Sequence, residues 1–177
     1  MNNMQIKIIV AIASNNVIGD ENNHIPWSFH PEDMKIFATK TKSEGATVIM
    51  GRKTFESLPS KYKPLPNRRN IVLTHDKNWS YEGVEAFNSI NEILENLKDN
   101  TKSVWICGGA KVYEQFMDMA DELHISHFDV SPECVGNIAC AMFPKIDYNI
   151  WEEIKSDKYD IVNNSPSFLH KVYQRRH

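Results

Sequence analysis

The sequence has few cysteines and no long hydrophobic run. Its three cysteines, Cys107, Cys134 and Cys140, are an odd number, which argues against a complete disulfide framework and predicts reduced thiols in a cytoplasmic protein. No stretch approaches the ~20 apolar residues that a membrane helix needs, so no membrane association is expected. The first five residues also lack the apolar run of a signal peptide.

An overall excess of positive charge is absent as well. The net charge of −3 gives no support to nucleic-acid binding as the main activity. Basic residues gather in the segment 51–70, which carries +5 and so leaves −8 for the rest of the chain. Such a local cluster suits a small anionic ligand better than a polyanion, although a solvated loop rich in lysine has the same composition.

Short apolar runs alternate with segments of helical spacing. The strand-like runs are Lys7–Ala13, Thr47–Met50, Asn70–Thr74 and Val104–Cys107. The predicted helices are Pro31–Lys42, Ile90–Leu97 with Ser89 as its cap, and one after Gly109 that carries Val112, Phe116 and Met119. Three further strand-like segments, 123–130, 153–162 and 168–173, follow without helices between them. The pattern predicts one α/β domain over residues 1–177, with a central mixed, mostly parallel β-sheet flanked by helices and an antiparallel C-terminal edge.

Two of the predicted strands run directly into predicted helices that begin with glycine. The segment 48–50 leads into Gly51-Arg52-Lys53, and 104–107 leads into Gly108-Gly109-Ala110. A helix N-terminus offers unpaired N–H groups, and glycine allows a phosphate to approach closely. Each junction alone is more often a tight turn, and neither is a Rossmann fingerprint or a Walker loop. Together they predict a cleft for a pyrophosphate at the carboxyl edge of the sheet.

Asp33 is the most informative acidic residue. It falls in the first turn of a predicted helix, where a carboxylate is favoured even without a function. It also lies next to Met34, one turn before Phe37, and after a long irregular segment, 14–30, that has the length of a lid. A carboxylate with apolar neighbours under a lid is a candidate general acid or charge partner.

The histidines and cysteines of the C-terminal half do not form a metal motif. His124 and His127 lie three apart on a predicted strand, so their side chains face opposite ways, and Cys134 and Cys140 are not a close pair. We therefore expect no metal site. A serine hydrolase has no support either, because the sequence contains no G-x-S-x-G elbow.

Taken together and in order, these segments resemble the dihydrofolate reductase family over nearly the whole chain. The resemblance rests on I-V-A-I-A-S-N-N-V-I-G (9–19), P-W (26–27), E-D-M-K-I-F (32–37) and V-I-M-G-R-K-T-F-E-S-L (48–58). It continues through P-L-P-N-R-R-N-I-V-L-T (64–74), W-I-C-G-G-A-K-V-Y-E-Q-F (105–116) and H-I-S-H-F-D (124–129). It implies a bacterial-type enzyme that reduces dihydrofolate with NADPH and binds antifolates, and we expect a monomer.

The resemblance also implies a substrate site. Asp33 matches the acid that binds the pterin, and Arg68 matches the arginine that pairs with the glutamate-tail carboxylate. The matching pocket residues are Ile9, Val10, Ala11, Met34, Phe37, Leu58, Leu65, Cys107, Tyr113 and Ser126. Asp33, Trp27 and Tyr113 are the implied catalytic group. Asp33 is expected to favour pterin protonation while the proton arrives from water, and Trp27 and the loop 19–26 exclude bulk solvent.

The implied NADPH site uses both glycine junctions. Its residues are Ala11, Ile18, Gly19, Gly51, Arg52, Lys53, Thr54, Leu73, Thr74, His75, Cys107, Gly108, Gly109, Ala110, Lys111, Val112 and Gln115. The Gly108–Gly109 peptide is usually cis in the family. Arg52, with Thr74 and His75, matches the place where the ribose 2′-phosphate is held, which favours NADPH over NADH.

The chain departs from the family pattern at three places. His24 and His30 look like single insertions, Cys107 replaces an aliphatic residue, and the loop 136–144 is longer and lacks an acid. Two other functions stay open at this point. A pyrimidine reductase of riboflavin synthesis resembles this fold and uses NADPH, but it needs neither Asp33 nor Arg68. A nucleotide-binding module without turnover would lack a reason to keep the pterin pocket.

Overall fold

The fold is that of a computed structural model, which describes residues 4–20, 24–42, 46–97, 101–133 and 140–177. The helices are α1 (Pro31–Lys42), α2 (Arg52–Glu56), α3 (Ile90–Leu97) and α4 (Ala110–Phe116). The strands are β1 (Gln5–Ala13), β2 (Val17–Gly19), β3 (Thr47–Gly51), β4 (Arg69–Leu73), β5 (Val84–Phe87), β6 (Ser103–Ile106), β7 (Glu122–Phe128), β8 (Ala141–Met142), β9 (Trp151–Tyr159) and β10 (Phe168–Arg175).

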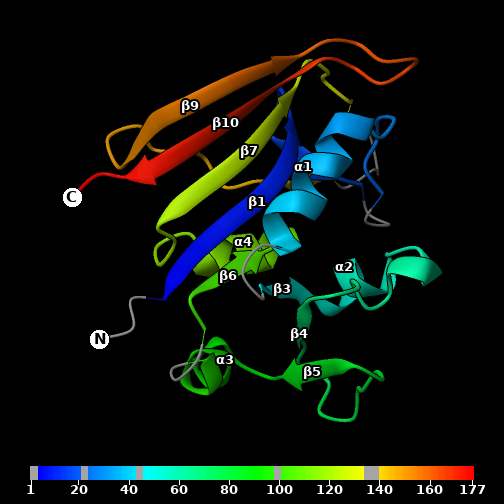
Figure 1. The fold of residues 1–177 in the computed structure, drawn as a ribbon, viewed down its shortest axis with the longest axis vertical. Helices are drawn as coiled ribbons and strands as arrows, with labels where there is room; N and C mark the ends of the chain where they lie inside the picture. The colour runs from blue at the N-terminus through cyan, green and yellow to red at the C-terminus, as the bar shows by residue number, and fades with distance from the viewer. Residues whose placement is uncertain (1–3, 21–23, 43–45, 98–100, 134–139) are drawn as a thin grey trace.

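Eight strands form one mixed sheet in the order β5-β4-β3-β6-β1-β7-β10-β9. The six strands from β5 to β7 are parallel, whereas β10 pairs antiparallel with both β7 and β9. Figure 1 shows β9 and β10 at one edge of the sheet and β5 at the other. The predicted fold class, a mostly parallel sheet with an antiparallel C-terminal edge, is confirmed.

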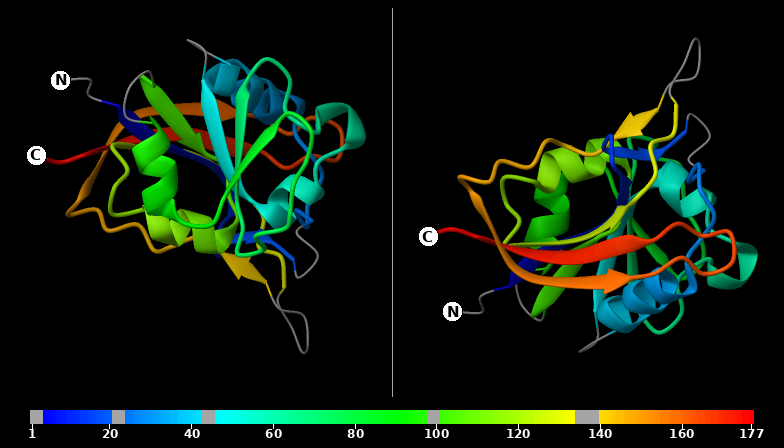
Figure 2. Two further views of the ribbon diagram at one scale, coloured as in Figure 1. Left: turned by 90° about the horizontal axis from the view of Figure 1, so that it is seen from below. Right: turned by 90° about the horizontal axis from the view of Figure 1, so that it is seen from above.

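The hydrophobic core has two parts, one on each face of this sheet. Successive residues of β1 alternate between them: Ile8 packs in the cluster with Phe116 of α4, and Ile9 packs in the cluster with Phe55 of α2. Phe37 of α1 joins the second cluster. The helices therefore cover both faces, as Figure 2 shows for α1 and α4. This explains why the central strands read as nearly continuous apolar runs.

Three details of the predicted secondary structure are wrong. The segment 14–30 is not wholly irregular, because Val17–Gly19 pairs as β2 with β8. Neither of these strands nor β5 was predicted, since runs of two to four residues are too short to show a recognisable period. The third helix ends at Phe116, and the amide of Met119 then closes a turn on the Phe116 carbonyl. The Ser89 cap is confirmed: its hydroxyl accepts the Glu92 N–H at 3.2 Å.

The cysteines also differ from expectation. Cys140 is disulfide-bonded and Cys107 is a free thiol, so the expectation of fully reduced cysteines is wrong. An odd number excludes complete pairing but still permits one bond. Cys134 and residues 136–139 of the departing loop 136–144 lie outside the described residues. The cytoplasmic location stays a prediction.

Candidate active site

The two glycine junctions meet at the carboxyl edge of the sheet. Strands β3 and β6 are parallel neighbours, so both end on the same side. The Gly51 N–H donates to the Gly108 carbonyl at 2.8 Å, and the Cys107 N–H donates to the Ile49 carbonyl at 2.8 Å. The predicted adjacency of the two turns is therefore confirmed.

Glycine suits both turns because a side chain there would crowd its neighbours. A Cβ on Gly51 would lie 3.3 Å from Cγ2 of Val112, and one on Gly109 would lie 3.1 Å from Oγ1 of Thr54. Gly108 has a φ of +112°, and its peptide bond to Gly109 is cis, as the resemblance implied. Neither α2 nor α4 has a side-chain cap at its N-terminus. This bare backbone cradle fits a phosphate group.

Positive side chains surround the cradle, and one of them has partners of its own. Arg52 donates through Nε to Glu56 at 2.9 Å and through Nη1 to Asp76 at 3.0 Å, and the bond from Arg52 lowers the pKa of Glu56. Lys53 and Lys111 are exposed. Of the other predicted cofactor residues, Thr54, Leu73 and Ala110 are half-buried, Val112 and Thr74 are buried, and His75 and Gln115 are exposed.

Asp33 lies in the first turn of α1 and faces β7. The Ser126 hydroxyl donates a hydrogen bond of 2.5 Å to its Oδ1. Burial raises the pKa of Asp33, while the Ser126 bond and the charge of His30 act in the opposite direction. Its neighbour Glu32 is exposed. The structure therefore places Asp33, and not Glu32, against the sheet.

Tyr113 lies against the glycine cradle and is close enough to Asp33 to feel its charge. Its hydroxyl donates to the Ile9 carbonyl at 2.8 Å, and a Cβ on Gly108 would lie 3.2 Å from the same hydroxyl. Burial, followed by the charges of Cys107 and Asp33, raises the pKa of Tyr113 well above its usual value. The phenol is therefore neutral throughout the physiological range.

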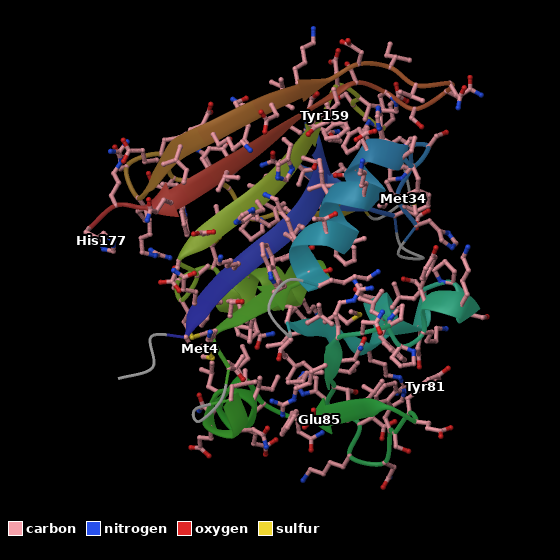
Figure 3. The ribbon with its side chains drawn as sticks, in the orientation of Figure 1. Met4, Met34, Tyr81, Glu85, Tyr159 and His177 are labelled. Atoms are coloured by element: carbon pink, nitrogen blue, oxygen red, sulfur yellow. The ribbon has the colours of Figure 1, made fainter. Side chains whose placement is uncertain are left out.

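The predicted pocket residues are mostly brought together. Ile9 and Leu65 are buried in one cluster, and Phe37 and Leu58 pack half-buried against it. Val10 is buried in the cluster on the opposite face of the sheet. Ala11 is also half-buried. Met34 is 49% exposed on the first turn of α1, which makes it the most open residue of the set (Figure 3).

Leu65 and Cys107 are both held in place by hydrogen bonds. The Leu65 N–H donates to the side chain of Asn70 at 3.0 Å, and the Asn70 amide donates back to the Leu65 carbonyl at 2.9 Å. The Cys107 thiol donates to the Trp105 carbonyl at 3.5 Å, and burial raises its pKa to about 12. Cys107 is therefore protonated and unreactive.

Arg68 is oriented by two oxygen atoms. It donates through Nη1 to the Thr41 hydroxyl at 2.8 Å and through Nε to the Pro66 carbonyl at 3.0 Å. Thr41 in turn donates to the Phe37 carbonyl at 2.7 Å, which fixes its position on α1. Within the described part of the chain, no carboxylate forms an ion pair with Arg68. Its charge remains available to a ligand.

The predicted lid is anchored to the body by short strands and one ring contact. β2, which contains Ile18 and Gly19, pairs with β8, and the Trp27 ring lies 5.4 Å from the ring of Phe128. The Phe143 N–H also donates to the Asn16 carbonyl at 2.8 Å. Residues 21–23 of the predicted lid lie outside the described residues.

The sequence pattern of dihydrofolate reductase matches residues 5–175. The chain belongs to the dihydrofolate reductase family. A dihydrofolate reductase from Staphylococcus aureus is 37% identical over 175 residues, covering 97% of this chain and 100% of that protein. One from Neisseria meningitidis serogroup A is 38% identical over 172 residues, covering 97% and 99%.

A solved structure agrees with these relatives. The dihydrofolate reductase from Enterococcus faecalis, complexed with NADP(H) and RAB-propyl, superposes with a TM-score of 0.83 at 30% identity and covers 98% of this chain and 97% of its own. The predicted family and enzyme class, an NADPH-dependent oxidoreductase, are confirmed. No helix among the described residues is long and apolar enough to cross a membrane.

Several residues that surround this candidate site were not predicted. Thr41, Asp76 and His170 bond to Arg68, Arg52 and Ser126, respectively. Lys40 bonds to His170 and His124, and His30 accepts the Glu32 N–H. His124 and His127 were weighed only as metal ligands. Their opposite orientation is confirmed, since His124 contacts Lys40 and His127 contacts the Tyr173 hydroxyl. Their partners depend on strand register, which the sequence does not reveal.

Proposed function

We propose that this chain reduces 7,8-dihydrofolate to 5,6,7,8-tetrahydrofolate with NADPH. The observation that carries the proposal is Tyr113, whose hydroxyl lies against Gly108 of the cradle and whose pKa responds to the charge of Asp33. An acid on an apolar wall and a phosphate-binding backbone are thereby parts of one site. Family membership supports the same reaction.

The cradle residues would hold the cofactor. Backbone N–H groups after Gly51 and Gly109 meet the pyrophosphate, and Lys53 and Lys111 add positive charge at the rim. Arg52 and the side chains of Thr74 and His75 bind the 2′-phosphate. To do so, Arg52 must break its hydrogen bond to Asp76. When bound, NADPH supplies the hydride.

The pocket beside β1 would hold the substrate. Asp33 accepts hydrogen bonds from the pterin amino group and ring N–H, and the apolar residues of the wall contact the pterin and benzoyl rings. Arg68 pairs with the carboxylate of the glutamate tail, because its guanidinium is already aimed by Thr41 and Pro66. Inhibitors with the same pterin-like ring and tail would use the same contacts.

The reaction also needs a proton on the imine nitrogen next to the carbon that accepts the hydride. The negative charge of Asp33 favours a protonated pterin, and the proton itself comes from water. Trp27, Ile18 and Gly19 close over the reacting rings and exclude bulk solvent. Tyr113 stays protonated and holds the wall through Ile9.

All of these residues come from one chain, so we infer that a monomer is active. Sedimentation at assay concentrations would test this: a dimer that loses activity on dilution would contradict it.

The reaction itself is tested by mixing purified protein, NADPH and dihydrofolate and following NADPH absorbance. We expect oxidation of NADPH that depends on dihydrofolate, with tetrahydrofolate as product. Absence of turnover by folded protein would overturn the proposal.

A further inference from the structure

A continuous chain of hydrogen bonds connects Asp33 to a lysine two turns further along α1. The Ser126 hydroxyl bonds to Asp33 at 2.5 Å and lies 2.9 Å from Nδ1 of His170. Nε2 of His170 lies 3.1 Å from Nζ of Lys40, which also lies 2.6 Å from Nδ1 of His124. Three separate elements, α1, β7 and β10, thus contribute to one polar cluster beneath the helix.

The fold explains why these side chains meet. His170 is the direct cross-strand partner of Ser126 in the antiparallel pair of β7 and β10. His124 lies two residues before Ser126, so both point to the same face of β7. Asp33 and Lys40 are seven residues apart, which places them on the same side of α1 over that face.

The donors and acceptors in this chain of hydrogen bonds give it a single direction. A lysine ammonium only donates, so Nε2 of His170 must accept and Nδ1 must carry the hydrogen. Nδ1 then donates to Ser126, and the Ser126 hydroxyl donates to Asp33. By the same logic His124 donates through Nε2 to Glu122 at 2.7 Å. Every donor between Lys40 and Asp33 therefore points toward the carboxylate.

We propose that Lys40 and His170 are positioning residues for Asp33, which act through Ser126 to fix the orientation of the carboxylate and to stabilise its ionised form. Their significance for catalysis rests on the function proposed above. The orientation of these hydrogen bonds does not rest on that function, because it is a property of the free protein.

The charges around the chain are consistent with this role. Burial, together with the charges of Lys40 and His124, lowers the pKa of His170 to about 3, so its ring is neutral at pH 7. Burial also lowers the pKa of Lys40 to about 8, which leaves the ammonium mostly protonated at that pH. At neutral pH these hydrogen bonds therefore run from a cation through two neutral groups to the carboxyl group of Asp33.

Other titratable groups face both ends. Asp33 is faced by His30, which precedes α1, and by Tyr113 of α4. Lys40 is faced by charges from three strands: Lys7, Glu122, Lys155 and Asp157. Lys7 and Lys155 lower the pKa of Lys40, whereas Glu122 and Asp157 raise it. None of these groups lies between His170 and Ser126. Variants of His170 and Lys40 therefore test the effect of the hydrogen bonds from Lys40 to Asp33.

The test is a carbon-13 NMR titration of the Asp33 carboxyl, assigned with Asp33→Asn, in the protein without ligands. His170→Phe keeps a ring but removes both nitrogens, and Lys40→Met keeps length but removes the charge. We expect each to raise the pKa of Asp33 by about 0.5 to 1, a three- to tenfold higher proton affinity. His127→Phe is the matched control, because His127 lies next to Ser126 but bonds to Tyr173, and it should leave that pKa unchanged.

Nitrogen-15 spectra of the unmodified protein provide a measurement that needs no variant. We expect His170 with a protonated Nδ1 and an unprotonated Nε2 at pH 7. The opposite tautomer, or an unchanged pKa of Asp33 in folded His170→Phe and Lys40→Met, would overturn the proposal. Neither measurement uses turnover, so failure to reduce dihydrofolate would contradict the proposed function while leaving this result intact.

Discussion

Nη1 of Arg52 lies 3.0 Å from Oδ2 of Asp76, at the place where we propose that the 2′-phosphate of NADPH binds. The arginine is thus paired with a carboxylate of its own chain, and a phosphate must compete with that carboxylate. A charge-assisted hydrogen bond to the 2′-phosphate still favours NADPH over NADH. We predict that Arg52→Ala reduces the preference about 10- to 100-fold in relative kcat/KM, measured with both cofactors. Equal use of both by the unmodified protein would contradict this role.

Asp76→Asn should act in the opposite direction. Loss of the carboxylate releases Arg52 and removes a negative charge from the phosphate site, so NADPH should bind about 2- to 10-fold more tightly, most clearly at low salt. Fluorescence titration with NADPH measures the change, and NADH should show little. Lys77→Gln, a neighbouring exposed charge change, is the control. Weaker NADPH binding in Asp76→Asn would show that the acid supports the site.

Substitutions at Arg68 and Thr41 should weaken only the binding of the glutamate tail of the substrate. Arg68→Ala is expected to weaken dihydrofolate binding about 10- to 100-fold, because a charge-assisted contact with the tail is lost. Thr41→Val removes the hydroxyl that orients Arg68 and should cause a smaller loss of the same kind. Binding of analogues without the glutamate tail should change little in either variant. A uniform loss for both classes of ligand would show that Arg68 supports the fold instead.

The glycine cradle offers a matched pair of substitutions. Gly108 and Gly83 both have positive φ, at +112° and +78°, so alanine should cost about 1 to 3 kcal/mol of folding stability at each. Only Gly108→Ala also places a methyl group against Tyr113 beside the cofactor cleft. We expect urea unfolding to detect both and NADPH titration to detect Gly108→Ala alone. Normal NADPH binding by Gly108→Ala would remove the cradle from the proposed site.

Much of the fold follows from local pattern. The apolar runs at 47–50 and 104–107, and the stripe after Ser89, predict buried strands and a helix because burial on two faces or one stripe fixes their composition. β2, β5 and β8 were missed because their stability comes from pairing with distant partners. The disulfide at Cys140 escaped prediction for a similar reason, since spacing alone does not reveal a bond.

The site residues also fall into those that local sequence predicts and those that it does not. Gly51, Gly108 and Asp33 were recognised because glycine before a helix and an acid in a first turn are local signals. Lys40, Asp76 and His170 were not, although they bond to predicted residues or to their partners. Their partners are fixed by the register of β10 on β7 and by how α1 crosses the sheet. Sequence periodicity contains neither quantity.

Asp33→Asn is the most direct test of the proposed reaction. Burial raises the pKa of Asp33, but the carboxylate must be charged at neutral pH to favour a protonated pterin. The amide keeps the shape and removes that charge, so the rate of hydride transfer at pH 7 should fall about 10²- to 10⁴-fold. As the pH falls, solvent protonates more substrate, and the variant should recover more than the parent. Glu32→Gln, the exposed neighbour, should be nearly silent.

The measurement is the pH–rate profile of hydride transfer for the parent and for Asp33→Asn, from pH 5 to pH 9. We predict a profile for the variant that lies far below the parent at pH 7 and approaches it toward pH 5. A helix-capping role for Asp33 predicts instead about 1 kcal/mol or less of lost stability and near-normal turnover. Two parallel profiles of similar height would contradict the assignment of Asp33 and, with it, the proposed reaction.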